Sequence, residues 1–344
     1  MTSVQGHQQS PGAGAPLRVG VLGGGAMAAV HLRTLSSSPY ARVVGVAAKT
    51  LSTEVLALAE LVGAQCTSVD RLLETGGLDA VVIATPTDTH ADFACLAAEH
   101  HVAVFCEKPL ARHPAEGERI ANAVAAHGTK VAVGHVLRYF PEYEQARRVV
   151  LGGKLGTIST ARMFRVNASP ATVKGWYAEP SRSGGLLFDL AIHDLDWCRW
   201  TLGPVRRVYA CQSGESGHEV VSVLLRHTGG AIAYIDASWR DKRLQTGLEI
   251  CGTAGLYRVG GSTDAGFELS LDVAGAPSYL PGDAFDSVRA DNPYRVELED
   301  ALGWFAGGPP PRSVLADGLA ALRVAAAAEE SIRRARPIEV EIDR

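Results

Sequence analysis

Residues 17–28 read Leu17-Arg-Val-Gly-Val-Leu22-Gly23-Gly-Gly25-Ala26-Met27-Ala28, an apolar run followed by three glycines and the start of a helical pattern that continues to about residue 36. A strand, a glycine turn and a helix in this order are the context that a G-x-G-x-x-G/A motif needs. Gly23 permits the tight turn, Gly25 lets the backbone approach a pyrophosphate, and Ala28 keeps the helix close to the strand. The helix start, with Ala26 and Met27, then offers free N–H groups to phosphates. The stretch therefore predicts a dinucleotide site, although a plain glycine-rich turn is the alternative.

The same alternation of strand and helix continues downstream of the glycine turn. Apolar runs predict strands over residues 42–48, 79–84, 102–106 and 130–134, and helical spacing predicts helices over 54–62, 90–100 and 114–126. Strands separated by amphipathic helices indicate βαβ units and a parallel sheet covered on both faces. We expect an α/β chain whose first domain, residues 17–136, is a Rossmann dinucleotide-binding domain.

After about residue 135 the pattern changes. Strands are predicted over residues 158–166, 206–212, 220–226, 231–239 and 247–251 with no helix between most of them, and helices over 141–151, 185–202, 294–305 and 314–335. Strands that alternate apolar and polar residues indicate an antiparallel sheet with one covered face. We expect residues 137–344 to form an α+β substrate-binding and oligomerisation domain with a large, mostly antiparallel open sheet. Residues 1–16, rich in Gly, Ser, Gln and Pro, are expected to be a disordered tail.

Composition excludes several classes of protein. The 344 residues are 47% hydrophobic and 20% charged with a net charge of −4, as in a globular protein without a basic surface for nucleic acid. No apolar stretch is long enough to span a bilayer, and six scattered cysteines without a C-x-x-C pair indicate reduced thiols. We therefore expect a cytoplasmic protein with no nucleic-acid or membrane partner.

The end of the second predicted strand selects between the two nicotinamide dinucleotides. Enzymes that use NAD place Asp or Glu there, roughly 20 residues after the glycine turn, to bind the ribose 2′-hydroxyl. This chain instead has Ala48, Lys49 and Thr50. A lysine and a hydroxyl bind a 2′-phosphate, whereas a carboxylate repels one. The sequence favours NADP and leaves NAD possible, because Lys49 is also explained as an ordinary solvated lysine.

Five motifs in a fixed order carry a resemblance to a known family. They are Gly23-x-Gly25-x-x-Ala28-x-x-His31, Ala84-Thr85-Pro86-x-x-x-His90, Glu107-Lys108-Pro109, Gly134-His-x-x-Arg138-x-x-Pro141, and Gly184-Gly-x-x-x-Asp189-x-x-x-His193-x-x-Asp196. Together they resemble the family named after glucose–fructose oxidoreductase, inositol dehydrogenase and the rhizopine-catabolism protein. The last motif looks especially like the inositol dehydrogenase branch.

The resemblance implies roles on the cofactor side of the site. Lys108 is implied to contact the nicotinamide ribose and the reacting oxygen, with Glu107 near the cofactor, although a structural Lys–Glu ion pair is the alternative. Thr85, Pro86 and His90 are implied to line the adenosine or ribose side, and core packing explains His90 about as well.

Asp189 and His193 lie four residues apart on a predicted helix and so share one face. Histidine titrates near neutrality and suits proton transfer. The resemblance implies that Lys108, Asp189 and His193 form the catalytic set, with Asp189 orienting His193 or a substrate hydroxyl. A metal site on Asp189, His193 and Asp196 lacks a second His or Cys at ligand spacing, so no metal is expected.

The resulting hypothesis is an NAD(P)-dependent oxidoreductase that moves hydride to or from a carbinol or carbonyl carbon of a sugar, amino sugar or cyclitol. Arg165, Asn167 and Trp176 are weaker candidates for contact with this small polyhydroxylated substrate. Two alternatives stay open. One is a redox-neutral enzyme that retains its cofactor, acting in oxidoreduction or glycoside cleavage, and the other is a non-catalytic dinucleotide-binding regulator. A homodimer or homotetramer is expected by resemblance.

Overall fold

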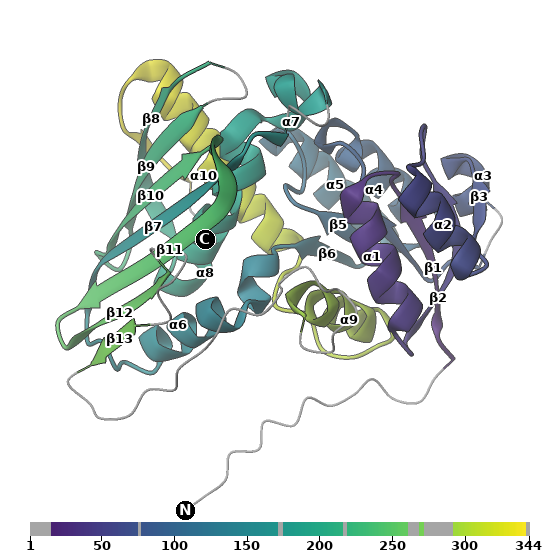
Figure 1. Cartoon of the computed structure of the whole chain (residues 1–344), viewed down its shortest axis with the longest axis horizontal. Helices are drawn as coiled ribbons and strands as arrows, with labels where there is room; N and C mark the ends of the chain where they lie inside the picture. The colour runs from purple at the N-terminus through teal and green to yellow at the C-terminus, as the bar shows by residue number, and fades with distance from the viewer. Residues whose placement is uncertain are drawn as a thin grey trace, which may run out of the picture.

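The computed structural model describes residues 15–74, 77–170, 175–215, 219–260, 268–271 and 292–341, without the side chains of residues 241–243 and 268–271. Most of the tail expected over residues 1–16 lies outside these ranges. Within them the chain forms two sheets with helices between and around them (Figure 1). The expected fold class is confirmed: a parallel sheet in the first part of the chain and a mixed, mostly antiparallel sheet in the second.

The first sheet has the strand order β3-β2-β1-β4-β5-β6, and all of its pairs are parallel. Its strands are β1 (Leu17–Leu22), β2 (Ala41–Ala47), β3 (Gln65–Thr67), β4 (Ala80–Ile83), β5 (Ala103–Glu107) and β6 (Val131–Gly134). The helices are α1 (Ala26–Ser37), α2 (Thr53–Leu61), α3 (Val69–Glu74), α4 (His90–Glu99) and α5 (Pro114–His127), with a short turn η1 (Thr87–Thr89) before α4. Buried Val and Ile residues on both sides of the strands explain why helices cover both faces.

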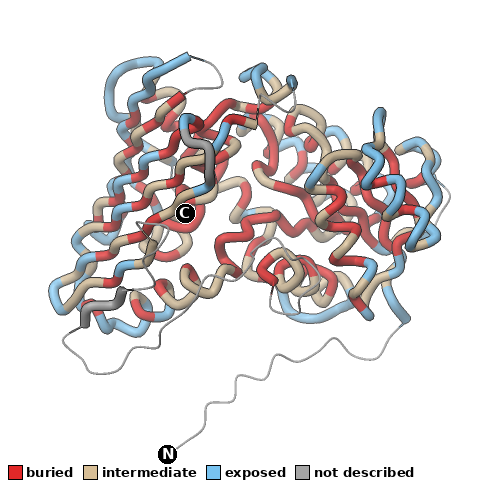
Figure 2. The backbone as a smooth tube through the Cα atoms, viewed as in Figure 1, coloured by how far each residue is buried: buried red, intermediate tan, exposed pale blue. Residues whose placement is uncertain are grey.

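The second sheet has the order β13-β12-β11-β7-β10-β9-β8-β14, in which β7 and β10 are parallel and the other neighbours antiparallel. Its strands are β7 (Ile158–Ala168), β8 (Val205–Ser213), β9 (Val220–His227), β10 (Ile232–Ser238), β11 (Arg240–Gly252), β12 (Gly255–Gly260), β13 (Glu268–Leu271) and β14 (Ile338–Glu339). Buried and exposed residues alternate along β8, β9 and β10 (Figure 2). The buried residues face the helices, and the others form an outer face.

The remaining helices connect the two sheets. They are η2 (Val136–Tyr139), α6 (Pro141–Leu151), η4 (Gly175–Ala178), α7 (Pro180–Ser183), η5 (Leu187–Ala191), α8 (Ile192–Leu202), α9 (Pro293–Phe305) and α10 (Leu315–Arg334). α8 and α10 pack on the large sheet, and α10 also contacts α5 and β6. Leu298, Ala301 and Leu302 of α9 share a core with α1, so this late helix packs back on the parallel sheet.

The helix predicted over residues 185–202 is present, but it is not α-helical throughout. Gly185 and Leu186 are α-helical, Leu187–Ala191 form a π-helical turn, and α8 follows from Ile192. Gly184 and Gly185, both at positive φ, precede this turn. A π-turn has a wider repeat than an α-helix and is frequent at functional sites, so the four-residue spacing of Asp189 and His193 does not have simple helical geometry.

Candidate functional site

The glycine turn lies at the carboxyl edge of the parallel sheet. Gly23 has φ of +142°, and a Cβ added there would lie 2.4 Å from the carbonyl oxygen of Ala84. Gly25 is the N-cap of α1, and the first turn of that helix carries no acidic residue. The helix dipole and its free N–H groups are therefore not neutralised by the chain, which fits a dinucleotide pyrophosphate.

A cavity of about 1080 Å³ runs from the glycine turn to the large sheet. It is lined by every residue but one to which the sequence assigned a cofactor, catalytic or substrate contact: Gly23, Gly25, Met27, Lys49, Thr50, Thr85, Pro86, His90, Glu107, Lys108, Arg165, Asn167, Trp176, Asp189 and His193. Ala26 is the exception, with an exposed side chain at the first position of α1. Among the described residues no three His, Cys, Asp or Glu side chains converge as a metal-ligand set.

The loop after β2 lies at one end of the cavity. Lys49 and Thr50 are exposed and line it together with Ala48. Asp70 at the start of α3 also lines this end, and sequence reasoning missed it because neither β3 nor α3 was predicted. The described part of this end thus presents one lysine and one carboxylate from different elements.

His90 is held by the chain itself. Its Nδ1 lies 2.8 Å from the carbonyl oxygen of Pro109, and its Nε2 lies 3.0 Å from that of Thr85. Burial lowers the pKa of His90, which favours the neutral ring. A neutral ring carries one N–H, so His90 donates to one of these two carbonyl oxygens at a time, and only the rest of the ring is left to line the cavity.

Glu107 ends β5 with a buried carboxylate. His31 of α1 donates from Nε2 to Oε1 at 2.7 Å, and Oε2 accepts the backbone N–H of Lys108 at 3.2 Å. Burial alone would raise the pKa of Glu107, but the hydrogen bond and charge of His31 and the charge of Lys108 outweigh it and hold this pKa low. The carboxylate is therefore fixed in its ionised form beside Lys108.

Lys108 and Asp189 form the contact that joins the two halves of the chain in the cavity. Lys108 Nζ donates to Asp189 Oδ1 at 2.9 Å and to the Asp189 carbonyl oxygen at 2.6 Å. The expected orientation of His193 by Asp189 is absent among the hydrogen bonds of the described residues, because the carboxylate pairs with Lys108 instead.

His193 is the second residue of α8, four residues after Asp189. Its Nδ1 is buried and has no hydrogen-bond partner among the described residues, so Nε2 is the ring nitrogen left to face the cavity. Burial, followed by the charges of Lys108, Arg165 and His135, lowers the pKa of His193 well below its usual value. The ring is therefore a neutral base at pH 7.

Arg165 and Asn167, two of the substrate candidates, use part of their hydrogen-bonding capacity within the chain. Arg165 is buried, and its Nε and Nη2 donate to the Asp194 carboxylate at 2.8 and 2.9 Å, while Nη2 also donates to the Tyr143 hydroxyl oxygen at 3.2 Å. Asn167 caps its own strand end, accepting the backbone N–H of Ala168 at 2.8 Å. Within the described part of the chain, no hydrogen bond engages Nη1 of Arg165 or the side-chain amide nitrogen of Asn167, so these atoms can bind a ligand.

Aromatic side chains make up much of the wall on this side. Trp176 stacks on Tyr177 with ring centroids 3.9 Å apart. Tyr177, Trp239 and Tyr294 also line the cavity, and sequence reasoning missed all three. Tyr294 comes from α9, far along the chain, and only the folding of α9 onto the first sheet brings it here. A wall of this kind suits the apolar C–H face of a ring-shaped substrate.

Comparison with known proteins agrees with this geometry. Residues 17–135 match the oxidoreductase family with an NAD-binding Rossmann fold, and residues 143–258 match the GFO/IDH/MocA C-terminal domain. The inositol 2-dehydrogenase of Rhizobium meliloti (strain 1021) is 30% identical over 340 residues, covering 94% of this chain and 99% of the relative. The chain belongs to this oxidoreductase family.

Other known proteins align over similar lengths. The rhizopine catabolism protein MocA of Rhizobium meliloti is 26% identical over 322 residues, covering 92% of this chain and 95% of that protein. The structure of GenD2 from gentamicin A biosynthesis in complex with NAD superimposes with a TM-score of 0.84 at 26% identity, covering 97% of this chain and 99% of GenD2. The chain is thus an oxidoreductase with the cofactor fold of an NAD-binding family.

Proposed function

We propose that this oxidoreductase oxidises a carbinol of a sugar, amino sugar or cyclitol, or reduces the corresponding carbonyl, with a nicotinamide dinucleotide. The observation that carries the proposal is the convergence of Lys108, Asp189 and His193 on one cavity that begins at the glycine turn. Relatives named for inositol oxidation support the substrate class.

Different residues of the cavity would bind different parts of the dinucleotide. Gly23, Gly25 and the start of α1 would hold the pyrophosphate, the loop at Lys49 and Thr50 the adenosine ribose, and Glu107 and Lys108 the nicotinamide end. When bound, the dinucleotide supplies the hydride acceptor or donor.

The chain supplies proton transfer and positioning. An alcohol and its ketone differ by one hydride and one proton, so a base must take the hydroxyl proton as hydride leaves. His193, neutral because of its lowered pKa, accepts that proton at Nε2. Lys108 holds the same oxygen as a hydrogen-bond donor, and Asp189 fixes the position of the Lys108 ammonium.

A substrate panel tests this function. Nicotinamide absorbance is followed with inositols, aldoses, ketoses and amino sugars, each with NAD and with NADP. We expect saturable turnover with at least one cyclitol or sugar, abolished in Lys108→Ala. Turnover of simple aliphatic alcohols alone would contradict the substrate class.

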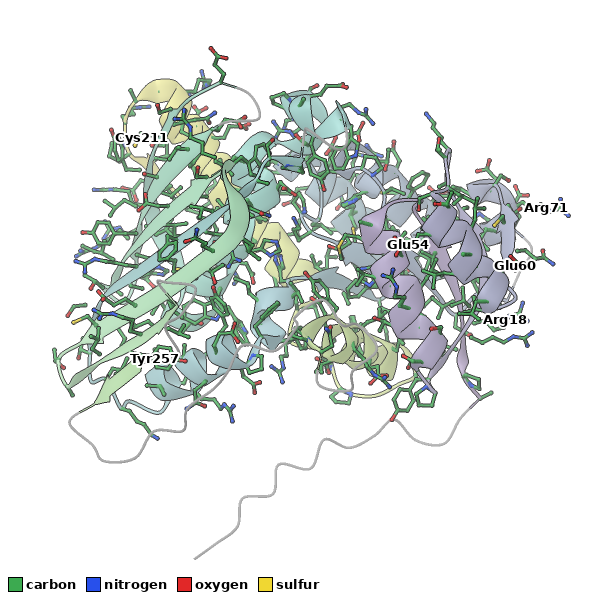
Figure 3. The ribbon with its side chains drawn as sticks, in the orientation of Figure 1. Arg18, Glu54, Glu60, Arg71, Cys211 and Tyr257 are labelled. Carbon is green, nitrogen blue, oxygen red and sulfur yellow. The ribbon has the colours of Figure 1, made fainter. Side chains whose placement is uncertain are left out.

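We also propose a cytoplasmic homodimer or homotetramer. The apolar residues Val221, Val223, Ala233 and Ile235 of the large sheet do not argue for a partner, because they are buried against the chain's own helices. The outer face of the sheet supports the proposal instead: Tyr209 and Tyr234 are 40% and 42% exposed there, and Cys211 lies on the same strand as Tyr209 (Figure 3). Light scattering that shows only monomer at micromolar concentration would contradict the oligomer.

All six cysteines are free thiols, as expected in a reducing compartment, and no described helix has the length and apolar character to cross a membrane.

A further inference from the structure

Two neighbouring histidines carry buried ring nitrogens without partners. His135 follows β6 and is 1% exposed, and both of its ring nitrogens lack a hydrogen-bond partner among the described residues. The same holds for Nδ1 of His193. Buried polar atoms in native proteins are nearly always hydrogen-bonded to protein or ordered water, and exceptions often mark a catalytic role. Three such atoms on two interacting rings call for an explanation.

His135 lies against the part of α8 that carries His193. His135 Nδ1 lies 3.8 Å from Oδ2 of Asp196, and Asp196 lies three residues after His193 on the same helix face. The charge of His135 also lowers the pKa of His193, as the smallest contribution after burial, Lys108 and Arg165. His135 therefore lies beside the turn of α8 that carries both the base and a buried carboxylate.

The proposed reaction leaves a proton on His193 that must be passed on. A proton accepted by His193 is unstable there, because burial and the cations of Lys108 and Arg165 disfavour the charged ring. Asp189 does not relieve it, since its carboxylate is paired with Lys108. The proton must leave by Nδ1, the side of the ring that faces away from the cavity.

We propose that His135 is a positioning residue that orients His193 and takes over its proton through Nδ1, directly or through one water. The substrate O–H bond breaks as Nε2 of His193 gains that proton, and the Nδ1 proton of His193 passes to a ring nitrogen of His135. His193 returns to a neutral tautomer, and in the reductive direction the steps run backward. This relay rests on the proposed dehydrogenase function.

The burial and charged neighbours of His135 allow it to pass a proton on but not to hold one. Asp196 and Arg199 face it from α8, Arg138 from η2 and Asp317 from α10. Burial lowers the pKa of His135 to about 4 against the attraction of Asp196. Asp196 itself stays ionised, because Arg138 binds it through two hydrogen bonds of 2.6 and 2.8 Å and offsets the effect of burial on its pKa. The proton thus passes through a ring that does not retain it and leaves to solvent on the side of Asp317, whose side chain is 22% exposed.

The test compares His135→Phe with His227→Phe. His227 is a matched control because it is also 1% exposed with an unpartnered Nε2, but it lies at the end of β9, where its Nδ1 bonds the carbonyl oxygen of Gly203, and it is not among the groups that act on His193. With the best substrate of the panel, we expect kcat of His135→Phe to fall at least about tenfold, while KM and the dissociation constant of the dinucleotide change less than about twofold. His227→Phe should keep the wild-type kcat.

Proton release gives a more direct readout. In a weakly buffered stopped-flow experiment with a pH indicator, the wild type should release its proton in step with nicotinamide reduction, and His135→Phe should release it later. Simultaneous release in both proteins, or a kcat within twofold of wild type, would overturn the relay while leaving the dehydrogenase function intact.

A substrate-independent measurement keeps the inference testable if no panel member reacts. In ¹⁵N-histidine spectra of the protein with NAD bound, the His193 Nδ1 resonance should shift in His135→Phe and in the smaller His135→Asn, but not in His227→Phe. An unchanged resonance in both His135 variants would show that the two rings do not communicate.

Discussion

Lys108 Nζ lies 2.9 Å from Oδ1 of Asp189 and 2.6 Å from the carbonyl oxygen of the same residue. The contact joins the residue after β5 to the π-helical turn before α8, 81 positions later in the chain. Asp189 therefore acts on Lys108, and among the described residues its carboxylate makes no hydrogen bond to His193.

This pairing predicts a specific pattern of coupling in double-mutant cycles. Asp189→Ala and Lys108→Ala should each lower kcat/KM strongly, and the double variant should be little worse than Lys108→Ala, with a coupling of about 1 kcal/mol or more. Asp189→Ala and His193→Ala should combine nearly additively, within about 0.5 kcal/mol. Strong coupling of Asp189 to His193 with none to Lys108 would contradict the pairing.

The lowered pKa of His193 predicts the acid side of the pH profile. Oxidation needs the neutral ring, and burial together with the Lys108 and Arg165 charges keeps it neutral below its usual pKa of 6.5. The acid limb of kcat/KM in the oxidative direction should therefore lie below pH 6.5. A limb at or above that pH would assign it to another group, and loss of the limb in His193→Gln would confirm the assignment.

The loop after β2 predicts cofactor preference. Ala48 stands where NAD-dependent enzymes have Asp or Glu, and Lys49 is exposed beside the cavity. We therefore expect the wild type to favour NADP over NAD by about tenfold in kcat/KM, or roughly 1.4 kcal/mol. Ala48→Asp should reverse the preference through repulsion of the 2′-phosphate, and Lys49→Ala should weaken NADP alone. A wild type that prefers NAD tenfold would contradict the prediction and direct attention to Asp70 as the ribose contact.

The sequence predicted the parallel sheet and the glycine turn because both rest on local patterns, namely apolar runs, helical spacing and glycines at a strand end. It missed β3 and α3, since elements of three and six residues carry too little periodicity to stand out. It also missed the π-turn, which no propensity scale separates from an α-helix.

The candidate site was predictable as a set of residues and not as a set of contacts. Nearly every residue to which the motifs assigned a role lines the cavity, yet the motifs did not predict that His31 and Glu107 pair across 76 positions and Lys108 and Asp189 across 81. Such partners depend on how βαβ units and the second sheet meet. Tyr294 lies at the start of a helix whose own sequence gives no sign that it folds back on the first sheet.

A final prediction concerns Glu297, which lies fully inside the protein one turn after Tyr294. It is 2% exposed, and neither carboxylate oxygen has a hydrogen-bond partner among the described residues. Burial, and then the Glu107 charge, raise the pKa of Glu297 well above its usual value, so the folded protein holds this acid neutral. Because the folded pKa is raised, its favourable contribution is complete below the pKa of an unfolded glutamate, near 4.3, and is lost as the pH rises through the folded pKa.

Glu297→Gln keeps the size of the side chain and removes its proton equilibrium. The variant should therefore gain free energy of unfolding relative to wild type as the pH rises from 5 to 8, by up to about 1.4 kcal/mol per pH unit while the unfolded state alone is ionised. Urea unfolding at several pH values measures this difference. Glu60→Gln on α2 is the control, because Glu60 is exposed (Figure 3) and should show a nearly constant difference from wild type. A Glu297→Gln difference that is equally flat would mean that the buried carboxyl ionises as readily folded as unfolded, which its two unpartnered oxygens do not permit without large loss of stability.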